Sequence, residues 1–244
     1  MVKAQASLAV KVAVFGFDAE PGTPPARALQ VLTVRQGLPS AEVDARETFE
    51  AAALRAVAEA GLHLDAGPRR GRGARALRLV GLDDPPSGRG RTVTAWYYAT
   101  VPHGDVVRPV NWVPVGRSGP RLGAGEGAAF RAALDRLRAD SRHVAGAVSL
   151  LGEVFTGDDL FRLYRALHGE PEGSERTFRR RVQELRDAGV LKPVRDTEVA
   201  ALRLRVPRFR SPPGTGGRPP ELLRHAGTGG EEEQLAVLRT RRSA

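Results

Sequence analysis

The chain has no cysteine, which excludes disulfides, thiolate metal sites and a thiol nucleophile. Its 5 histidines are scattered and show no metal-ligand spacing. No apolar run is long enough to span a membrane. The run Leu8–Phe17 is interrupted by Lys11 and has no cleavage site after it, so we interpret it as a strand and not as a signal peptide. Together these absences predict a cytoplasmic protein with no metal centre, no cofactor and no membrane association.

The composition predicts folded domains and a polyanionic partner. The 244 residues suit two modest domains or one large one, and 41% hydrophobic content is enough for packed cores. The formal net charge of +10 favours nucleic acid as a partner. Arg, Ala, Gly and Pro are enriched throughout, so part of this charge reflects compositional bias.

Residues 1–140 alternate between strand and helix patterns. Segments rich in β-branched or aromatic residues predict strands at Leu8–Phe17, Leu29–Arg35, Ala76–Leu82, Thr92–Val101 and Val110–Val115. Helical spacing and composition predict helices at Glu47–Gly61 and at Ala128–Arg138, the second with Phe130, Leu134 and Leu137 on its apolar side. This order of elements indicates a mixed α/β layer fold.

A second unit is expected over residues 141–210. The segment Arg142–Leu151 is a connector with small apolar residues. Thr156 is placed as a helix N-cap with Asp159 at position N3, and Phe155 and Leu160 are spaced for a hydrophobic staple. We expect this helix to end at Gly169 and a second helix to follow after a short loop.

The second helix lies in Ser174–Leu191, with Ser174 as N-cap and Gly189 at C′. One face carries the apolar residues Phe178, Val182 and Leu185, and the other face carries Arg176, Arg180 and Gln183, flanked by Arg179 and Arg181. Such a helix fits the DNA major groove, because arginine binds both phosphates and guanine edges. The alternative is an ordinary solvated surface helix.

The sequence after this helix favours DNA binding. Apolar stretches at Val190–Val194 and Ala201–Val206 on either side of Arg195–Ala200 predict a hairpin, which would be the wing of a winged helix-turn-helix domain. Residues 211–244 are rich in Pro and Gly and have no continuous apolar face, so we expect a disordered tail.

The segment Leu38–Leu62 resembles the Nudix box, G-x5-E-x7-R-E-U-x-E-E-x-G-U, where U is aliphatic. Aligned from the left, Glu47 matches the first glutamate, Arg55 the arginine and Glu59 one of the paired glutamates. Aligned backwards from Gly61, Arg55 takes the place of a glutamate instead. Both registers leave the helix one of its three clustered carboxylates. The resemblance implies a Nudix-like α/β/α sandwich with a mixed sheet.

The loss of carboxylates predicts that the domain is not an enzyme. Nudix pyrophosphate hydrolysis relies on divalent cations bound between glutamates and the substrate's phosphates, and one carboxylate cannot assemble such a cluster. We therefore expect no catalytic residues.

A degenerate Nudix domain followed by a winged helix resembles the Nudix-related transcriptional regulators of NAD metabolism. The second domain carries the more specific match, in Phe155-Thr156 and in the run Arg176-Thr177-Phe178-Arg179-Arg180-Arg181. The resemblance implies a dimeric regulator, usually a repressor, that binds operator DNA and senses ADP-ribose or a related NAD-derived nucleotide. We expect base contacts from Arg176, Arg180 and Gln183, and backbone contacts from Arg179, Arg181 and Lys192, with Thr177 also in the interface.

The same resemblance suggests effector-binding residues. The loop Asp83–Arg91 is a reduced form of the family's nucleotide-binding loop that keeps Arg89 and Arg91, whose guanidinium groups suit a pyrophosphate. Arg35 ends the second predicted strand, where the family often has an arginine near the ligand. Trp112 is placed either to stack on an adenine or to pack in the core.

Two other functions remain open on sequence alone. One is a surviving Mg²⁺-dependent ADP-ribose or nucleotide pyrophosphatase whose second domain binds a protein. In the other, the first domain has lost sensing and serves only as a dimerisation scaffold.

Overall fold

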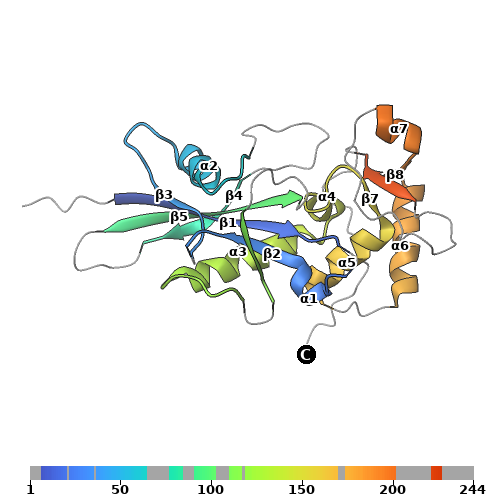
Figure 1. The fold of residues 1–244 in the computed structure, drawn as a ribbon, viewed down its shortest axis with the longest axis horizontal. Coiled ribbons are helices and arrows are strands. Elements are labelled where there is room, and N and C mark those ends of the chain that lie inside the picture. The colour runs from blue at the N-terminus through green and yellow to red at the C-terminus, as the bar shows by residue number, and fades with distance from the viewer. Residues whose placement is uncertain are drawn as a thin grey trace, which may run out of the picture.

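The computed structural model describes residues 7–20, 22–35, 37–64, 77–84, 91–102, 110–116, 119–169, 174–201 and 221–226. A sheet with strand order β4-β5-β1-β2-β6 forms the centre of the first part, and β3 also pairs with β1 (Figure 1). Its strands are β1 (Ser7–Phe17), β2 (Leu29–Thr33), β3 (Ser40–Glu42), β4 (Arg78–Asp83), β5 (Thr92–Pro102) and β6 (Asn111–Pro114). The pair β1 and β5 is parallel and the other pairs are antiparallel, so the sheet is mixed.

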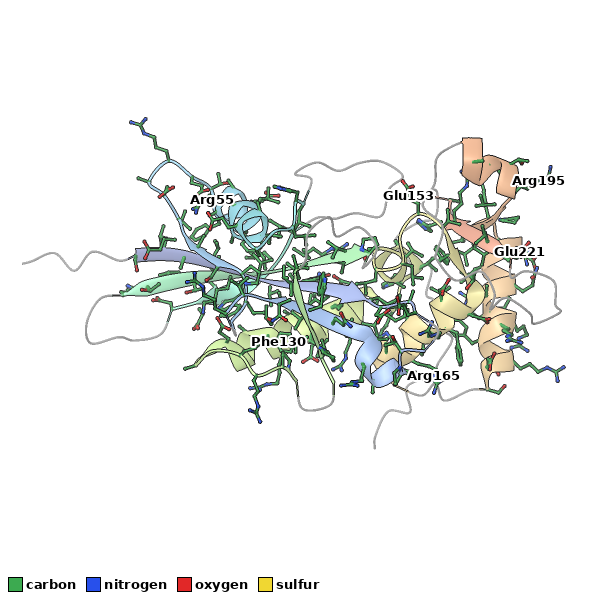
Figure 2. All side chains as sticks on the ribbon, viewed as in Figure 1. Arg55, Phe130, Glu153, Arg165, Arg195 and Glu221 are labelled. Atoms are coloured by element: carbon green, nitrogen blue, oxygen red, sulfur yellow. The ribbon has the colours of Figure 1, made fainter. Side chains whose placement is uncertain are left out.

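Helices cover both faces of this sheet. On β1, Val10, Val12 and Val14 face the helix α2 (Phe49–Glu59), and the alternate residues face α3 (Glu126–Asp140). Figure 2 shows Arg55 on α2 and Phe130 on α3, on opposite sides of the sheet. The predicted mixed-sheet α/β/α sandwich is confirmed.

The two long helices of this part begin and end near the predicted residues. The Thr48 side chain accepts a hydrogen bond from the N–H of Ala51 and so caps α2, and Gly61 has the positive φ of 90° expected of a glycine closing a helix. The predicted apolar side of α3, Phe130, Leu134 and Leu137, is buried. Local capping and helical spacing therefore determine these elements.

Three short elements before residue 150 were not predicted. They are α1 (Pro25–Ala28), β3, and α4 (Val144–Val148) inside the predicted connector. Each is five residues or fewer, which is too short for hydrophobic periodicity to reveal it.

The second part contains the two predicted helices, α5 (Gly157–His168) and α6 (Glu175–Asp187). Thr156 and Asp159 form the capping box at the start of α5, and Ser174 caps α6. The end of α6 is a Schellman motif, because the N–H of Val190 donates to the Leu185 carbonyl and the N–H of Gly189 to the Arg186 carbonyl, both at 2.9 Å.

Only the first strand of the predicted hairpin after α6 lies wholly within the described residues. Strand β8 (Leu191–Val194) forms as expected, but it is followed by α7 (Asp196–Ala201), and residues 202–206 lie outside the described part. The Glu198 carboxylate accepts a hydrogen bond from the N–H of Arg195 at 3.2 Å, which helps α7 to begin. Among the described strands, β8 pairs with β9 (Leu222–His225).

The expectation of disorder for 211–244 is therefore wrong at β9. This strand lies between β8 and β7 (Phe155–Thr156) in a three-stranded antiparallel sheet, and its Leu222 and Leu223 are buried. Two leucines between Pro- and Gly-rich segments give no periodic signal, so only the pairing with distant strands defines this element.

The two parts share one hydrophobic cluster, which extends from Phe15 and Phe130 in the sandwich to Leu163 and Phe178 in α5 and α6. Arg162 of α5 links the two parts. Its guanidinium donates hydrogen bonds to three backbone carbonyls in the segment before α1, which belong to Ala19 (2.5 Å), Glu20 and Thr23 (3.2 Å). Among the described residues, no helix has the length and apolar character needed to cross a membrane.

Candidate nucleic-acid interface and effector site

Helix α6 buries one face and exposes the other, as predicted. Phe178, Val182 and Leu185 are buried, and the Phe178 ring lies 5.1 Å from that of Phe161 and 5.6 Å from that of Tyr164, both on α5. The rings fix α6 against α5, so the opposite face is held rigidly towards solvent. The exposed residues of that face include Arg176, Thr177, Arg179, Arg180 and Gln183.

Several of these polar side chains have partners on the same surface. Arg179 contacts Glu175 at 2.5 Å, and Arg180 and Arg181 contact Glu184 at 3.5 and 3.0 Å. Arg179 and Arg180 are exposed, so exchanging their ion pairs for contacts with a phosphate costs little free energy, whereas Arg181 is half-buried. The side-chain amide of Gln183 donates a hydrogen bond to Asp187 at 2.8 Å and accepts one from Arg186. Both ends of this amide are therefore already bound.

Arg176 has no ion-pair partner among the described residues, and the same holds for Lys192 on β8. Arg176 stands in the first turn of α6, the part of a recognition helix that reaches base edges. An exposed guanidinium with all its donors available is the strongest candidate for a base contact on this helix.

Strand β8 adds a second group of cations beside α6. Lys192 is exposed and lies directly opposite Arg224 of β9, whose guanidinium contacts Glu198 at 3.7 Å. Figure 2 shows Arg195 and Glu221 at the same end of the molecule. Sequence analysis missed Arg224, because the tail that contains it gave no strand signal.

The charged residues left from the Nudix box are bound to one another. Arg55 donates from Nε and Nη2 to Glu47 at 3.1 and 2.7 Å and from Nη1 to Glu59 at 3.4 Å. The hydrogen bond from Arg55 lowers the pKa of Glu47 and raises that of Arg55. This grouping favours the register aligned from the left, in which all three residues match the box. Within the described part of the chain, no three His, Cys, Asp or Glu side chains are grouped to hold a metal.

Two of the predicted effector residues lie on opposite sides of β1. Arg91 precedes β5 and its carbonyl accepts from the N–H of Ser7, whereas Arg35 follows β2. Arg91 is bound through Nε (2.8 Å) and Nη2 to Asp84, which raises the pKa of Arg91 and lowers that of Asp84. The structure therefore does not join Arg35 and Arg91 in one site, and Arg89 lies outside the described residues.

Arg35 and Trp112 belong to neighbouring parts of the sheet, because Arg35 follows β2 and Trp112 lies on β6, which pairs with β2. Arg35 is exposed in a turn closed by two hydrogen bonds between Val34 and Gly37, where it adopts a positive φ of 49°. Trp112 is half-buried opposite Leu32, and a Cβ added at Gly16 would lie 3.0 Å from its ring. The indole therefore packs flat over the sheet, which favours the core role among the two that the sequence left open.

A partly buried ion pair was missed by sequence analysis. Lys11, seen there as an interruption of an apolar run, contacts Glu126 at 2.5 Å and lies 5.5 Å from the centre of the Trp96 ring. Glu126 also accepts from the N–H of Leu38 at 3.2 Å. These contacts fasten the first turn of α3 to the sheet, so the role of the pair is structural.

Several solved structures have a fold similar to that of this chain. NrtR from Shewanella oneidensis, solved in complex with a 27mer DNA, is 22% identical with a TM-score of 0.60 over 90% of this chain and 94% of that one. A further structure of the same protein gives 21% identity and a TM-score of 0.61, covering 93% and 97% of the two chains. A MutT/nudix family protein from Enterococcus faecalis gives 16% identity and a TM-score of 0.57 over 91% and 89%.

These similarities show the class of fold to which the chain belongs. It is a Nudix-like sandwich with a mixed sheet, followed by a C-terminal domain. Over nearly its whole length this is the fold of NrtR. No protein-family model matches the sequence, and a search of curated proteins finds no relative.

Proposed function

We propose that this chain is a DNA-binding transcriptional regulator, acting as a repressor, whose Nudix-like domain binds ADP-ribose or a related NAD-derived nucleotide without hydrolysing it. The observation that carries the proposal is α6, a rigidly packed helix with an exposed row of arginines. The similar fold of NrtR, which was solved with a 27mer DNA, supports the same use. With β8 and β9 beside it, α6 serves as the recognition helix of a winged-helix domain.

The geometry suggests a division of roles on this surface. Arg176 and Arg180 contact base edges, because they are exposed at the start and middle of α6. Arg179, Arg181, Thr177 and Lys192 hold phosphates. Gln183 enters the interface only after its contacts with Asp187 and Arg186 break, so its contribution to specificity is small.

The DNA interface is tested by removing single arginines. Arg176→Ala should weaken binding to a mapped operator by about 1–3 kcal/mol, roughly 5- to 150-fold, and relax specificity at one base pair. Arg131→Ala, which removes an exposed arginine from α3, is the matched control and should leave affinity within about twofold. Equal affinities for Arg176→Ala and Arg131→Ala would reject α6 as the recognition helix.

The proposal that the first domain does not hydrolyse its ligand rests on the box. Both remaining box carboxylates, Glu47 and Glu59, contact Arg55, and the positions beside Glu59 are alanines. The helix keeps one of the three clustered carboxylates of the box, which is too few to assemble the divalent cations that catalysis would need. Mg²⁺-dependent hydrolysis of ADP-ribose to AMP and ribose 5-phosphate should therefore stay at the background rate, and turnover above it would favour a pyrophosphatase.

Effector binding is tested separately. ADP-ribose should raise the melting temperature of the protein and alter its DNA affinity, because a ligand that prefers one arrangement shifts the population towards it. If no NAD-derived nucleotide stabilises the protein, the first domain is a scaffold and the sensing part of the proposal is wrong, while DNA binding by α6 is unaffected.

A further inference from the structure

Helix α6 carries a line of exposed polar residues opposite its buried stripe. The line consists of Arg176, Arg180, Gln183 and Asp187, which follow one another at helical spacing. At a rise of about 1.5 Å per residue, it runs for about 16 Å along the helix, from the first turn to the last. This line faces away from α5, so it is the part of α6 that a groove of DNA would meet.

Most of the charged side chains of α6 contact an opposite charge. These ion pairs join Arg179 to Glu175, Arg180 and Arg181 to Glu184, and Arg186 to Glu221, at 2.5, 3.5, 3.0 and 2.9 Å. Glu184 is shared by two arginines, so the middle of the helix keeps a net positive charge. The remaining charges lie at the two ends of the exposed line.

Those two charges have opposite signs. Arg176 in the first turn and Asp187 in the last have no oppositely charged partner among the described residues. Asp187 accepts a hydrogen bond at 2.8 Å from the amide of Gln183, which is neutral. The helix dipole has the same sense, because the N-terminal end of a helix is partially positive and the C-terminal end partially negative. The exposed line of α6 is therefore positive where it begins and negative where it ends.

The stability of the helix does not account for the negative charge of Asp187. A carboxylate in the last turn lies at the negative end of the helix dipole, which is unfavourable. The hydrogen bond from Gln183 could be accepted equally well by the amide oxygen of an asparagine. The stop of the helix uses backbone groups of Gly189 and Val190 and not this side chain. No described contact requires the charge, so we looked for its effect on a bound polyanion.

On DNA, the two ends of the line favour one approach of the helix. Duplex DNA carries about one negative charge per 1.7 Å of its axis, and the Debye length in physiological salt is about 8 Å. A helix lying along the groove over its full length would bring Asp187 within this distance of several phosphates, and they would repel it. A helix that enters by its N-terminal end keeps Asp187 away from the phosphates and brings Arg176 to the base edges.

We propose that α6 contacts DNA through its first two turns only, and that Asp187 contributes to specificity by excluding the C-terminal end of the helix from the groove. Base contacts of Arg176 form in this orientation. Orientations that depend on phosphate contacts along the whole helix are disfavoured, so Asp187 weakens binding to unrelated sequences. The inference rests on the proposed function, because it takes α6 as the helix that binds DNA.

The test compares Asp187→Asn with Asp44→Asn by fluorescence anisotropy, on the mapped operator and on a scrambled duplex. Both substitutions raise the net charge by one, and Asp44 is an exposed residue before α2, at the other end of the molecule from α6 (Figure 1). At about 0.1 M salt, Asp187→Asn should raise the affinity for the scrambled duplex about two- to fivefold and lower the ratio of operator to scrambled affinity. Asp44→Asn should leave both affinities within about 1.5-fold.

Equal effects of the two substitutions on the scrambled duplex would overturn the inference. A loss of operator affinity in Asp187→Asn, with no change on the scrambled duplex, would also overturn it, because the carboxylate would then read a base such as cytosine. Failure of the proposed function gives a different result, in which the wild type binds the two duplexes equally. The comparison on the scrambled duplex still decides the role of Asp187 in that case, and no binding to either duplex at low salt would overturn both.

Discussion

The side chain of His168 makes the stability of the protein depend on pH in a defined window. It is the last residue of α5, its ring lies 4.7 Å from that of Tyr164, and its Nε2 is buried without a hydrogen-bond partner among the described residues. Burial first, and then the charges of Arg142 and Arg138, lower its pKa from 6.5 to about 4. Folding therefore favours the neutral imidazole.

The sign of the effect follows from the lowered pKa. Between pH 6.5 and about 4 the unfolded chain binds a proton at His168 and the folded chain does not, so stability is complete above pH 6.5 and falls as the pH drops through this window. The whole difference in pKa between the unfolded and folded chain corresponds to a change of at most about 3 kcal/mol in the free energy of unfolding. Because the ring is partly open to solvent, we expect about 1–2 kcal/mol.

The assay is urea unfolding at pH 7.5 and pH 4.5 for the wild type and for His168→Gln, which cannot titrate. The difference in free energy of unfolding between the two pH values should be smaller in the variant by about 1–2 kcal/mol. Paired carboxylates such as Glu47 also lose stabilisation in acid, but they do so in both proteins and cancel. Equal pH dependence in the two proteins would refute the assignment of a buried neutral His168.

Substitutions at three further positions test the packing of the second part by urea unfolding. Arg162→Ala should lower the free energy of unfolding by about 1–3 kcal/mol through loss of its hydrogen bonds to three carbonyls, and Arg162→Lys should recover part of it. Gly189→Ala should cost about 1–2 kcal/mol, because φ there is 76°. Thr156→Ala should cost about 1 kcal/mol by removing the cap of α5. A change below about 0.3 kcal/mol would contradict the contact concerned.

Local features of the sequence predicted much of the fold. The capping box at Thr156, the N-cap at Ser174 and the stop at Gly189 are fixed by residues within a few positions of one another, and each was confirmed. The burial of Phe178, Val182 and Leu185 was predicted from the same short-range spacing.

Features that depend on distant partners were not predictable. Strand β9 exists because β7 and β8 pair with it, although 20 or more residues separate it from α7. Its leucines carry no periodic signal in a Pro- and Gly-rich context. The bulge in β4 depends on its register with β5, and the hold of Arg162 on Ala19 joins residues 143 positions apart. Such contacts become visible only in three dimensions.

In the candidate site, too, some features could be predicted from the sequence and others could not. The exposed face of α6 could be derived from residue spacing, whereas the pairs that occupy Gln183 and Arg179 could not. The degenerate box revealed the loss of carboxylates, but only the structure shows that Arg55 bridges those that remain. The residues assigned to the effector by resemblance do not converge among the described residues.

The central claim is tested most directly by fluorescence anisotropy of the full-length protein on duplex DNA from its own upstream region, titrated with salt and repeated with ADP-ribose. The account predicts tight binding that exceeds binding to a scrambled duplex, weakens steeply with salt and changes when ADP-ribose is added. Weak binding that is equal on both duplexes, and is unchanged by Arg176→Ala, would contradict it.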